Sequence, residues 1–174
     1  FFRTLDAENL RSGYAEMIKH GLISNTEIWK HILSFDLDNV DYNRLSELLL
    51  ESISVKEKVV EIDPTEKGLR KVLNFGHTVG HAFESYAMEI GKPVLHGYAV
   101  AWGMISELYL SYKLLGFPKE ALSTAVRMIK ENYGALPIKC DIYDHLYDLM
   151  THDKKNEGDG RILFSLLKNI GEIE

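Results

Sequence analysis

The chain has 174 residues and a mass of 19.9 kDa, a size that accommodates one domain with a sizeable core and excludes two full domains. Hydrophobic residues make up 45% of the sequence and charged residues 26%, a composition that excludes disordered, collagen-like and coiled-coil proteins. The net charge of -6 and the pI near 5.7 provide no basic surface, so we expect neither nucleic acid nor an anionic membrane as a partner.

Helical periodicity governs the first part of the chain. The first expected helix follows Asp6, the second follows Asn25, and the third runs from Asp41 to about residue 62. In the third helix an apolar stripe is formed by Leu45, Leu49, Ile53 and Val60. Lys56 falls within this stripe, which is unusual because a buried ammonium is costly, although a single lysine commonly reaches the surface.

Further helices are expected over about residues 66–88, 97–115 and 141–151, with another helix directly after Pro118. Residues 153–160 have the composition of a loop, and residues 161–167 are typical of a short strand. The predicted fold class is therefore mostly α, a multi-helix domain with a small β element near its C-terminus.

Polar side chains recur every three or four residues along the fourth expected helix. They are Arg70, Asn74, His77, His81 and Glu84. The neighbouring stripe consists of Leu69, Leu73, Gly76, Gly80 and Phe83. A solvated helix face explains any one of the polar residues, but two histidines and two glycines are poor helix formers that such a face does not need. The G-x-x-x-G spacing also lets another backbone approach closely, so the pattern favours a functional site beside a packed seam.

Histidine spacing indicates a metal site. His77 and His81 lie four residues apart, so both imidazoles can reach one ion, and a third histidine, His96, opens the next helix. Glu16 lies on the polar face of the first helix, and one Glu with two His is a normal protein ligand set for catalytic zinc. Spacing alone leaves open which two histidines bind, and His96 is equally well explained as a helix-terminal residue without ligand function.

Basic residues accompany these positions although the protein is acidic. Five of them lie beside a suspected site residue or in a polar loop: Lys19, Lys56, Arg70, Lys154 and Lys155. Together they predict a pocket for a carboxylate or a phosphate.

These residues lie in segments that resemble 3-dehydroquinate synthase. The segments are SGYAEMIKHGLI from Ser12, Lys56 with the stretch from Val59 to Asp63, EKGLR from Glu66, LNFGHTVGHAFE from Leu73, LHGYAVAWGM from Leu95 and DKK from Asp153. They occur in the family's order and cover nearly the whole chain. The resemblance implies that residues 1–174 form the C-terminal metal- and substrate-binding domain of a longer protein, and that an N-terminal NAD-binding Rossmann-like domain is absent here.

The resemblance also implies roles for single residues. The metal ligands would be Glu16, His77 and His96, with zinc or cobalt as the ion, and His81 would belong to the substrate site instead. Substrate contacts would come from Lys19, Lys56, Arg70, Asn74, Lys154 and Lys155. Glu66 would position a base, and the residues nearest NAD would be Phe1, Phe2, Arg3 and Thr4. Tyr98 departs from the pattern, since the family commonly has Glu after His-Gly.

The reaction implied is the conversion of 3-deoxy-D-arabino-heptulosonate 7-phosphate into 3-dehydroquinate and phosphate, an NAD- and metal-dependent step of the shikimate pathway, by a homodimer. Another sugar-phosphate cyclase is the nearest alternative, but such relatives tend to change the residues matching Lys56, Arg70, Asn74 and His81. A phosphohydrolase of the HD type is a weaker alternative, because the His152-Asp153 dipeptide borders a loop. A helical interaction module would explain the apolar faces but not the polar stripe.

The remaining features concern location. A single cysteine, Cys140, cannot form an internal disulfide, which indicates a reducing compartment, and we expect a cytoplasmic protein. No apolar run reaches the roughly 18–20 residues of a membrane span, because the run around residues 98–105 ends before Glu107. The sequence opens on Phe1-Phe2 without a basic region, so we expect a fragment rather than a signal peptide.

Overall fold

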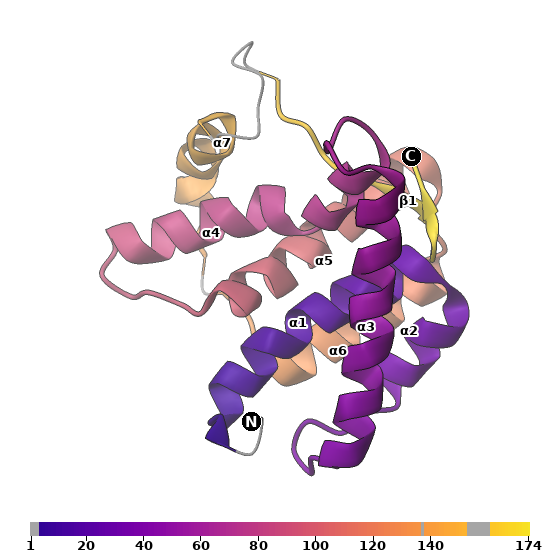
Figure 1. The fold of residues 1–174 in the computed structure, drawn as a ribbon. Helices are drawn as coiled ribbons and strands as arrows, with labels where there is room; N and C mark the ends of the chain where they lie inside the picture. Colours follow the sequence, from indigo (N-terminus) through magenta and orange to yellow (C-terminus); the bar gives the residue numbers. More distant parts are fainter. Residues whose placement is uncertain (1–3, 137, 153–160) are drawn as a thin grey trace.

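The computed structural model of the chain describes residues 4–136, 138–152 and 161–174. Within these residues the chain forms seven α-helices, two short 3-10 helices and one two-stranded antiparallel sheet (Figure 1). The predicted fold class, mostly α with a small β element near the C-terminus, is thereby confirmed. No helix among the described residues is both long and apolar enough to cross a membrane.

The first three helices begin where the sequence predicts. They are α1 (Ala7–Ser24), α2 (Thr26–Leu33) and α3 (Tyr42–Ile62). Each begins after an Asp or Asn whose side chain accepts from backbone N–H groups of the first turn: Asp6, Asn25 and Asp41. The buried face of α3 differs from the predicted stripe and consists of Leu45, Leu48, Ser52 and Val55. Ile53 lies on the exposed side, so the predicted stripe is wrong at this position, and Lys56 reaches the surface, as a single lysine commonly does.

The single helix expected over residues 66–88 is wrong. The chain instead forms a loop, the 3-10 helix η2 (Leu69–Asn74) and then α4 (His77–Glu89). Gly68 has φ -144° and ψ -109°, outside the helical region, and Gly76 has φ 80°, in the left-handed region. These two glycines interrupt the helix on either side of η2, so the polar residues do not form one continuous stripe.

Helices α4 and α5 (His96–Leu115) run antiparallel and side by side (Figure 1). Glycines make this contact close, as the G-x-x-x-G spacing predicts. A Cβ on Gly80 would lie 3.0 Å from the Val100 Cα, and one on Gly103 would lie 2.1 Å from the Gly76 carbonyl oxygen. We call this contact the α4–α5 seam and define it by Gly76, Gly80 and Gly103. Its backbones approach so closely that no side chain fits between them.

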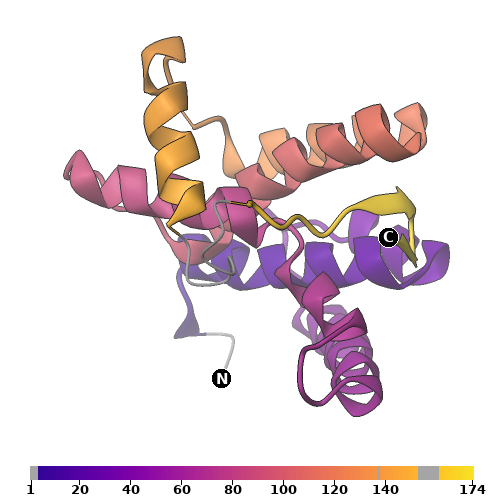
Figure 2. The ribbon, with the colours of Figure 1, turned by 90° about the horizontal axis from the view of Figure 1, so that it is seen from above.

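The remaining elements cover this pair. They are α6 (Lys119–Tyr133), the 3-10 helix η3 (Cys140–Ile142), α7 (Tyr143–Thr151) and the strands β1 (Leu167–Asn169) and β2 (Glu172–Ile173). Seen from above, α7 packs against α4 on the side away from α3, and the C-terminal hairpin lies along α1 (Figure 2). The Gly171 N–H donates to the Leu22 carbonyl and fixes the hairpin there.

The strand expected over residues 161–167 is misplaced, because β1 begins only at Leu167. Residues 161–166 are not assigned to a strand, although the Leu166 carbonyl accepts from the Glu174 N–H just after β2 at 3.1 Å; two of the residues before it bond to η2 and α4. The Leu163 carbonyl accepts from the Thr78 hydroxyl at 3.0 Å, and the Ser165 hydroxyl donates to the Lys71 carbonyl at 2.8 Å. Single hydrogen bonds to α4, to η2 and to the end of the hairpin thus hold this segment in place of a regular strand ladder.

Two groups of buried apolar side chains hold the helices. The larger group joins α1, α2, α3, α5 and α6 and contains Trp29. The smaller group lies where α4, α5 and α7 meet, and Trp102 packs against it while its indole N–H donates to the Gly134 carbonyl at 3.2 Å. The starts of α4 and α5 are therefore held between two separate hydrophobic clusters.

Candidate metal centre

Glu16 on α1, His77 at the start of α4 and His96 at the start of α5 lie together. Each offers one ligand atom, and these atoms all lie within 4.8 Å of one another. The Glu16 Oε1 is 3.4 Å from the His77 Nε2, and the His77 and His96 ring centroids are 5.3 Å apart. Three residues separated widely in the sequence therefore direct their side chains to one point.

The hydrogen bonds of the two imidazoles suit metal binding. The His77 Nδ1 lies 3.1 Å from the Phe75 carbonyl oxygen, and the His96 Nδ1 lies 3.1 Å from the Glu84 Oε2. Because a carbonyl and a carboxylate only accept, each Nδ1 donates, and the neutral ring then carries its lone pair on Nε2. Metal-binding histidines are usually oriented in this way by an acceptor behind the ring.

The Glu16 carboxylate supports the same interpretation. Its Oε1 is buried and has no hydrogen-bond partner among the described residues, although a buried oxygen without a partner is costly. Its other oxygen, Oε2, accepts from the Lys19 ammonium at 2.7 Å. One carboxylate and two imidazole nitrogens suit a divalent cation such as zinc, so the residues fit the ion implied by the resemblance.

The charge state of Glu16 follows from its neighbours. Burial alone would raise the pKa of this carboxyl, but the positive charge and hydrogen bond of Lys19 outweigh it and hold the pKa below its usual range. His20, on the same helix, is buried and bonds to the Ser52 hydroxyl at 2.6 Å. Burial, with the nearby charge of Lys19, lowers the pKa of His20 to about 4, so this ring is neutral at pH 7.

Close backbone contact fixes the position of His96 relative to α1. A Cβ on Gly97 would lie 1.9 Å from the Ser12 carbonyl oxygen, and the Gly97 N–H donates to the Ser12 hydroxyl at 3.1 Å. Ser12 lies one turn before Glu16 on α1. The helix that carries the carboxylate is thereby packed directly on the first turn of the helix that carries His96.

His81 lies next to the triad. Its ring centroid is 5.5 Å from that of His77 and 5.9 Å from that of His96. The group of candidate ligand atoms contains His96 and not His81, so the geometry favours the pair that the resemblance implies over the pair four residues apart. The ligand assignment and the substrate role of His81 stay predictions.

Glu66, Arg70 and Asn74 form a second cluster. The Glu66 Oε1 accepts from the Asn74 amide at 2.9 Å, and its Oε2 lies 3.8 Å from the Arg70 Nε. Glu66 has φ 57°, a left-handed conformation that non-glycine residues rarely adopt. The structure thus brings these three predicted substrate-site residues together without the continuous helix that the sequence suggested.

The Asp63 carboxylate organises this loop. It accepts from the backbone N–H groups of Lys67 at 3.2 Å, Gly68 at 2.7 Å and Arg70 at 3.1 Å. The bond from Gly68 contributes most to holding the pKa of Asp63 below the ordinary value of 3.8. We call residues 63–74 the Asp63 segment.

The other predicted site residues are placed as follows. Lys56 is exposed on α3, one turn after Ser52, and its charge acts on His20. Thr4 is exposed before α1. The other predicted NAD-site residues and lysines, Phe1, Phe2, Arg3, Lys154 and Lys155, lie outside the described residues, and so does Asp153 of the His152-Asp153 dipeptide.

Sequence reasoning missed three residues around the centre. Glu84 was noticed only as part of a polar stripe, not as the acceptor behind His96. His20 was part of a family segment without a role of its own. Glu107 was noticed only for ending an apolar run, yet it is fully buried and its Oε2 accepts from the Gly76 N–H at 2.8 Å. Its signal was a lone carboxylate on an apolar helix, which requires a buried partner.

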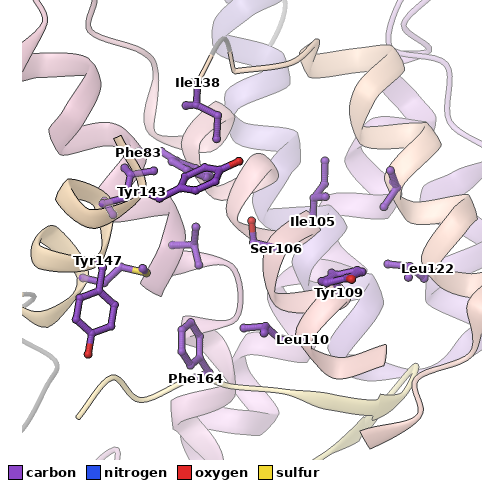
Figure 3. A pocket seen from close by; sticks show the side chains of 15 residues that line it. Phe83, Ile105, Ser106, Tyr109, Leu110, Leu122, Ile138, Tyr143, Tyr147 and Phe164 are labelled. Carbon is purple, nitrogen blue, oxygen red and sulfur yellow. The ribbon is translucent and has the colours of Figure 1, made fainter. Parts of the chain in front are cut away.

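A large hollow lies elsewhere, between α4, α5, α6 and α7 (Figure 3). It has a volume of about 720 Å³, and its lining is apolar and aromatic, with Phe83, Tyr109 and Tyr143 among the side chains. None of its described lining residues is a histidine, an acid or a base. Among its described lining residues the hollow therefore lacks the imidazole and carboxylate groups that form the triad.

Comparison with known proteins places this geometry in a family. The family described as 3-dehydroquinate synthase C-terminal matches residues 13–156, which include all three members of the triad. The chain belongs to this family. The 3-dehydroquinate synthase of Parabacteroides distasonis is 59% identical over 173 residues, which cover 99% of this chain and 49% of the relative. That of Bacillus pumilus is 39% identical and covers 97% of this chain and 46% of the relative. The chain thus spans about half the length of these relatives.

Two solved structures share the fold. A 2-deoxy-scyllo-inosose synthase complexed with carbaglucose-6-phosphate, NAD+ and Co2+ superposes with a TM-score of 0.76 at 22% identity, over 98% of this chain and 48% of that one. A 2-epi-5-epi-valiolone synthase from Streptomyces hygroscopicus with NAD+ and Zn2+ bound gives a TM-score of 0.75 at 22% identity, over 98% of this chain and 48% of that one. At this level of identity the likeness establishes the fold.

Proposed function

We propose that residues 1–174 form the metal- and substrate-binding half of a 3-dehydroquinate synthase, which converts 3-deoxy-D-arabino-heptulosonate 7-phosphate into 3-dehydroquinate and phosphate. The observation that carries this proposal is the triad of Glu16, His77 and His96, with both histidines oriented through Nδ1. The triad occurs in a chain 59% identical to an enzyme of that name.

The triad would hold a zinc or cobalt ion. When bound, the ion would act as a Lewis acid that favours ionisation of a substrate hydroxyl and polarises a ketone. Lys19 keeps Glu16 ionised and keeps a positive charge beside the centre, because its ammonium is almost completely buried against the carboxylate. His81 is close enough to donate to or accept from a group held at the triad.

The Asp63 segment would bind the charged end of the substrate. Arg70 presents a planar guanidinium that matches a carboxylate with two parallel hydrogen bonds. Asn74, whose amide donates to Glu66, would contact the substrate, and Glu66 would position a base. Lys56, Lys154 and Lys155 would add positive charge, and fixing a flexible sugar acid at both ends removes much of the entropy barrier to cyclisation.

NAD would be held mainly by a second, Rossmann-like half. This chain would contribute only the rim of the NAD site, through Phe1, Phe2, Arg3 and Thr4. Two observations support this division. The relatives are about twice as long as this chain, and its sequence contains no strand followed by a glycine-rich phosphate loop. The homodimer and the cytoplasmic location implied by the resemblance belong to the same proposal.

A phosphate-release assay on the full-length protein, supplied with NAD+ and zinc, tests this function. We expect turnover of the heptulosonate phosphate and none of glucose 6-phosphate, the natural counterpart of the analogue in the inosose synthase structure. Turnover of glucose 6-phosphate instead would establish the alternative, another sugar-phosphate cyclase. Release of phosphate from either compound without NAD+ would point to a phosphohydrolase and contradict both.

The 174 residues alone give a second test. We expect them to bind zinc weakly at best, to show no NAD+ binding in the micromolar range in calorimetry, and to release no phosphate above buffer. NAD-dependent turnover by this chain alone would overturn the division into two halves.

A further inference from the structure

Glu107 is a buried acid on the apolar helix α5. Its side chain is completely buried, and each of its oxygens accepts from a backbone N–H at the start of α4. The Oε2 accepts from Gly76 at 2.8 Å, and the Oε1 accepts from Val79 at 3.4 Å. Because no side chain of α4 itself caps this helix, Glu107 supplies the cap from the neighbouring helix.

The amide that Glu107 holds is directly connected to a candidate metal ligand. The Gly76 N–H and the Phe75 carbonyl belong to one planar peptide unit, in which they point in opposite directions. That carbonyl oxygen accepts from the His77 Nδ1 at 3.1 Å. A continuous chain of hydrogen bonds therefore runs from the Glu107 carboxylate through one peptide unit to the His77 ring.

The surroundings keep this peptide unit in place. Gly76 has φ 80°, and a Cβ there would lie 2.4 Å from the Met104 Cγ, so only glycine fits. Phe75 is completely buried. Gly103, one turn before Glu107 on α5, leaves the space that the Gly76 carbonyl occupies. The amide has no room to turn away from Glu107, and α4 and α5 are held in this way side by side (Figure 1).

The two histidines of the triad thus each have a carboxylate behind the ring. Glu84 contacts the His96 Nδ1 directly, whereas Glu107 reaches the His77 Nδ1 through the peptide unit. A negative charge at one end polarises the amide and makes its carbonyl oxygen a stronger acceptor. A stronger acceptor at Nδ1 makes the opposite nitrogen of the ring a better metal ligand.

We propose that Glu107 is a positioning residue of the metal centre, which orients His77 and increases its basicity through the Phe75–Gly76 peptide unit. This inference rests on the proposed metal-binding role of the triad. It extends that role to a residue on the buried side of the α4–α5 seam that contacts neither the ion nor the substrate.

The test is the variant Glu107→Gln in the 174-residue chain. Glutamine keeps the shape, and its one amide oxygen can still accept from Gly76, but it carries no charge and loses the second acceptor, which faces Val79. In the metal-free protein at neutral pH, we expect the proton resonance of the His77 Nδ1–H to move upfield while that of His96 stays in place. In titrations with zinc, we expect the affinity to fall about tenfold, at the lower end of the range for residues behind a ligand.

Two control variants separate this effect from general destabilisation. Glu84→Gln should move the His96 resonance instead and leave that of His77 unchanged. Ser111→Ala removes a buried hydroxyl on α5 that bonds to the Glu107 carbonyl and to the Leu167 N–H, so it should lower stability without affecting either histidine. If Glu107→Gln does not fold, Glu107→Asp, which keeps the charge but withdraws it from Gly76, is measured in its place with the same expected shift.

The possible outcomes are distinct. An unchanged His77 resonance and an unchanged zinc affinity overturn the inference, even if the melting temperature falls, because Glu107 is then only a helix cap. If the wild-type chain takes up no zinc, the proposed metal site fails. The metal-free resonances still decide in that case whether Glu107 acts on His77.

Discussion

The α4–α5 seam and the Asp63 segment hold their site residues in different ways. At the seam, backbones touch through glycines, and the buried Glu107 ties the start of α4 to α5. The Asp63 segment is mostly exposed and depends on one carboxylate that accepts from backbone N–H groups of the loop. The candidate metal ligands His77 and His96 thus begin helices that are packed against each other. Glu66, by contrast, lies on an exposed loop, and Arg70 and Asn74 follow it in η2, which contacts the larger core cluster through Val72. We therefore expect the loop ahead of η2 to open more readily than the seam.

The largest effect is expected from removing a ligand at the seam. His77→Ala should abolish turnover of the full-length protein and weaken zinc binding by more than the roughly 10–100-fold typical of residues behind a ligand. His81→Ala, one turn further along α4, should impair turnover and leave zinc bound. Elemental analysis of both purified variants checks this, and equal loss of metal in the two would show that the pair four residues apart binds the ion.

The second-largest effect is expected from a substitution that disrupts the close packing of the α4–α5 seam. Gly103→Ala places a methyl group 2.1 Å from the Gly76 carbonyl oxygen, so we expect the free energy of unfolding to fall by about 3 kcal/mol or more. Gly13→Ala is the matched control, because a Cβ at this helical position on α1 meets nothing within 4 Å. That control should leave the protein unchanged or stabilise it by up to about 1 kcal/mol. Denaturant titration that gave both variants equal stability would contradict the close packing of the seam.

On the Asp63 segment a conservative change should act on substrate binding alone. Arg70→Lys keeps the charge but loses the two-pronged contact, so we expect the KM for the heptulosonate phosphate to rise about tenfold, the equivalent of one charged hydrogen bond. Zinc affinity should stay at the wild-type value. Wild-type kinetics in this variant would contradict a bidentate role for Arg70.

The smallest effect is expected from loosening the loop. Asp63→Ala should speed amide hydrogen exchange at Gly68 and Arg70 and leave zinc binding intact. Asp6→Ala, which removes the cap of α1, is the control and should leave those two amides unchanged. A loss of zinc affinity in Asp63→Ala would contradict the independence of loop and seam.

Lowering the pH should have the same effect on the loop as Asp63→Ala, because protonation removes the charge of the Asp63 carboxylate. Because the folded pKa of Asp63 lies below its ordinary value of 3.8, the carboxylate stabilises the loop fully above that value. The stabilisation is lost as the pH falls through the lower folded pKa. Exchange at Gly68, compared with an amide within α1, measures the difference.

Much of the fold could be predicted because its signals are local. Asp6, Asn25 and Asp41 mark the starts of three helices, and each accepts from the first turn as expected. The break at Gly76 could not be read in this way, because isolated glycines also occur within helices. The space that excludes a Cβ at Gly76 is occupied by Met104, which lies on another helix.

The candidate site shows the same contrast between signals that are local in the sequence and contacts that depend on the tertiary structure. Glu16, His77 and His96 were chosen from residue types and from the family resemblance, and the structure brings them together. The partners of these residues were not predictable, because the Glu84 contact with His96 crosses a loop and the Glu107 contact with Gly76 joins two helices. Periodicity places residues on a face, but it does not show which face of another helix lies opposite.

Because each hydrophobic cluster contains or contacts one tryptophan, intrinsic fluorescence can follow the unfolding of the two clusters separately. Trp29 is buried in the larger cluster beside Gly21, whereas Trp102 is half-buried against the smaller one. The sequence contains two tryptophans, so replacing either one with Phe leaves a single indole in one known cluster. The fluorescence of each single-tryptophan protein then follows the melting of its own cluster. A lower midpoint for the protein that keeps Trp102 would show that the smaller cluster comes apart before the α1–α3 bundle unfolds.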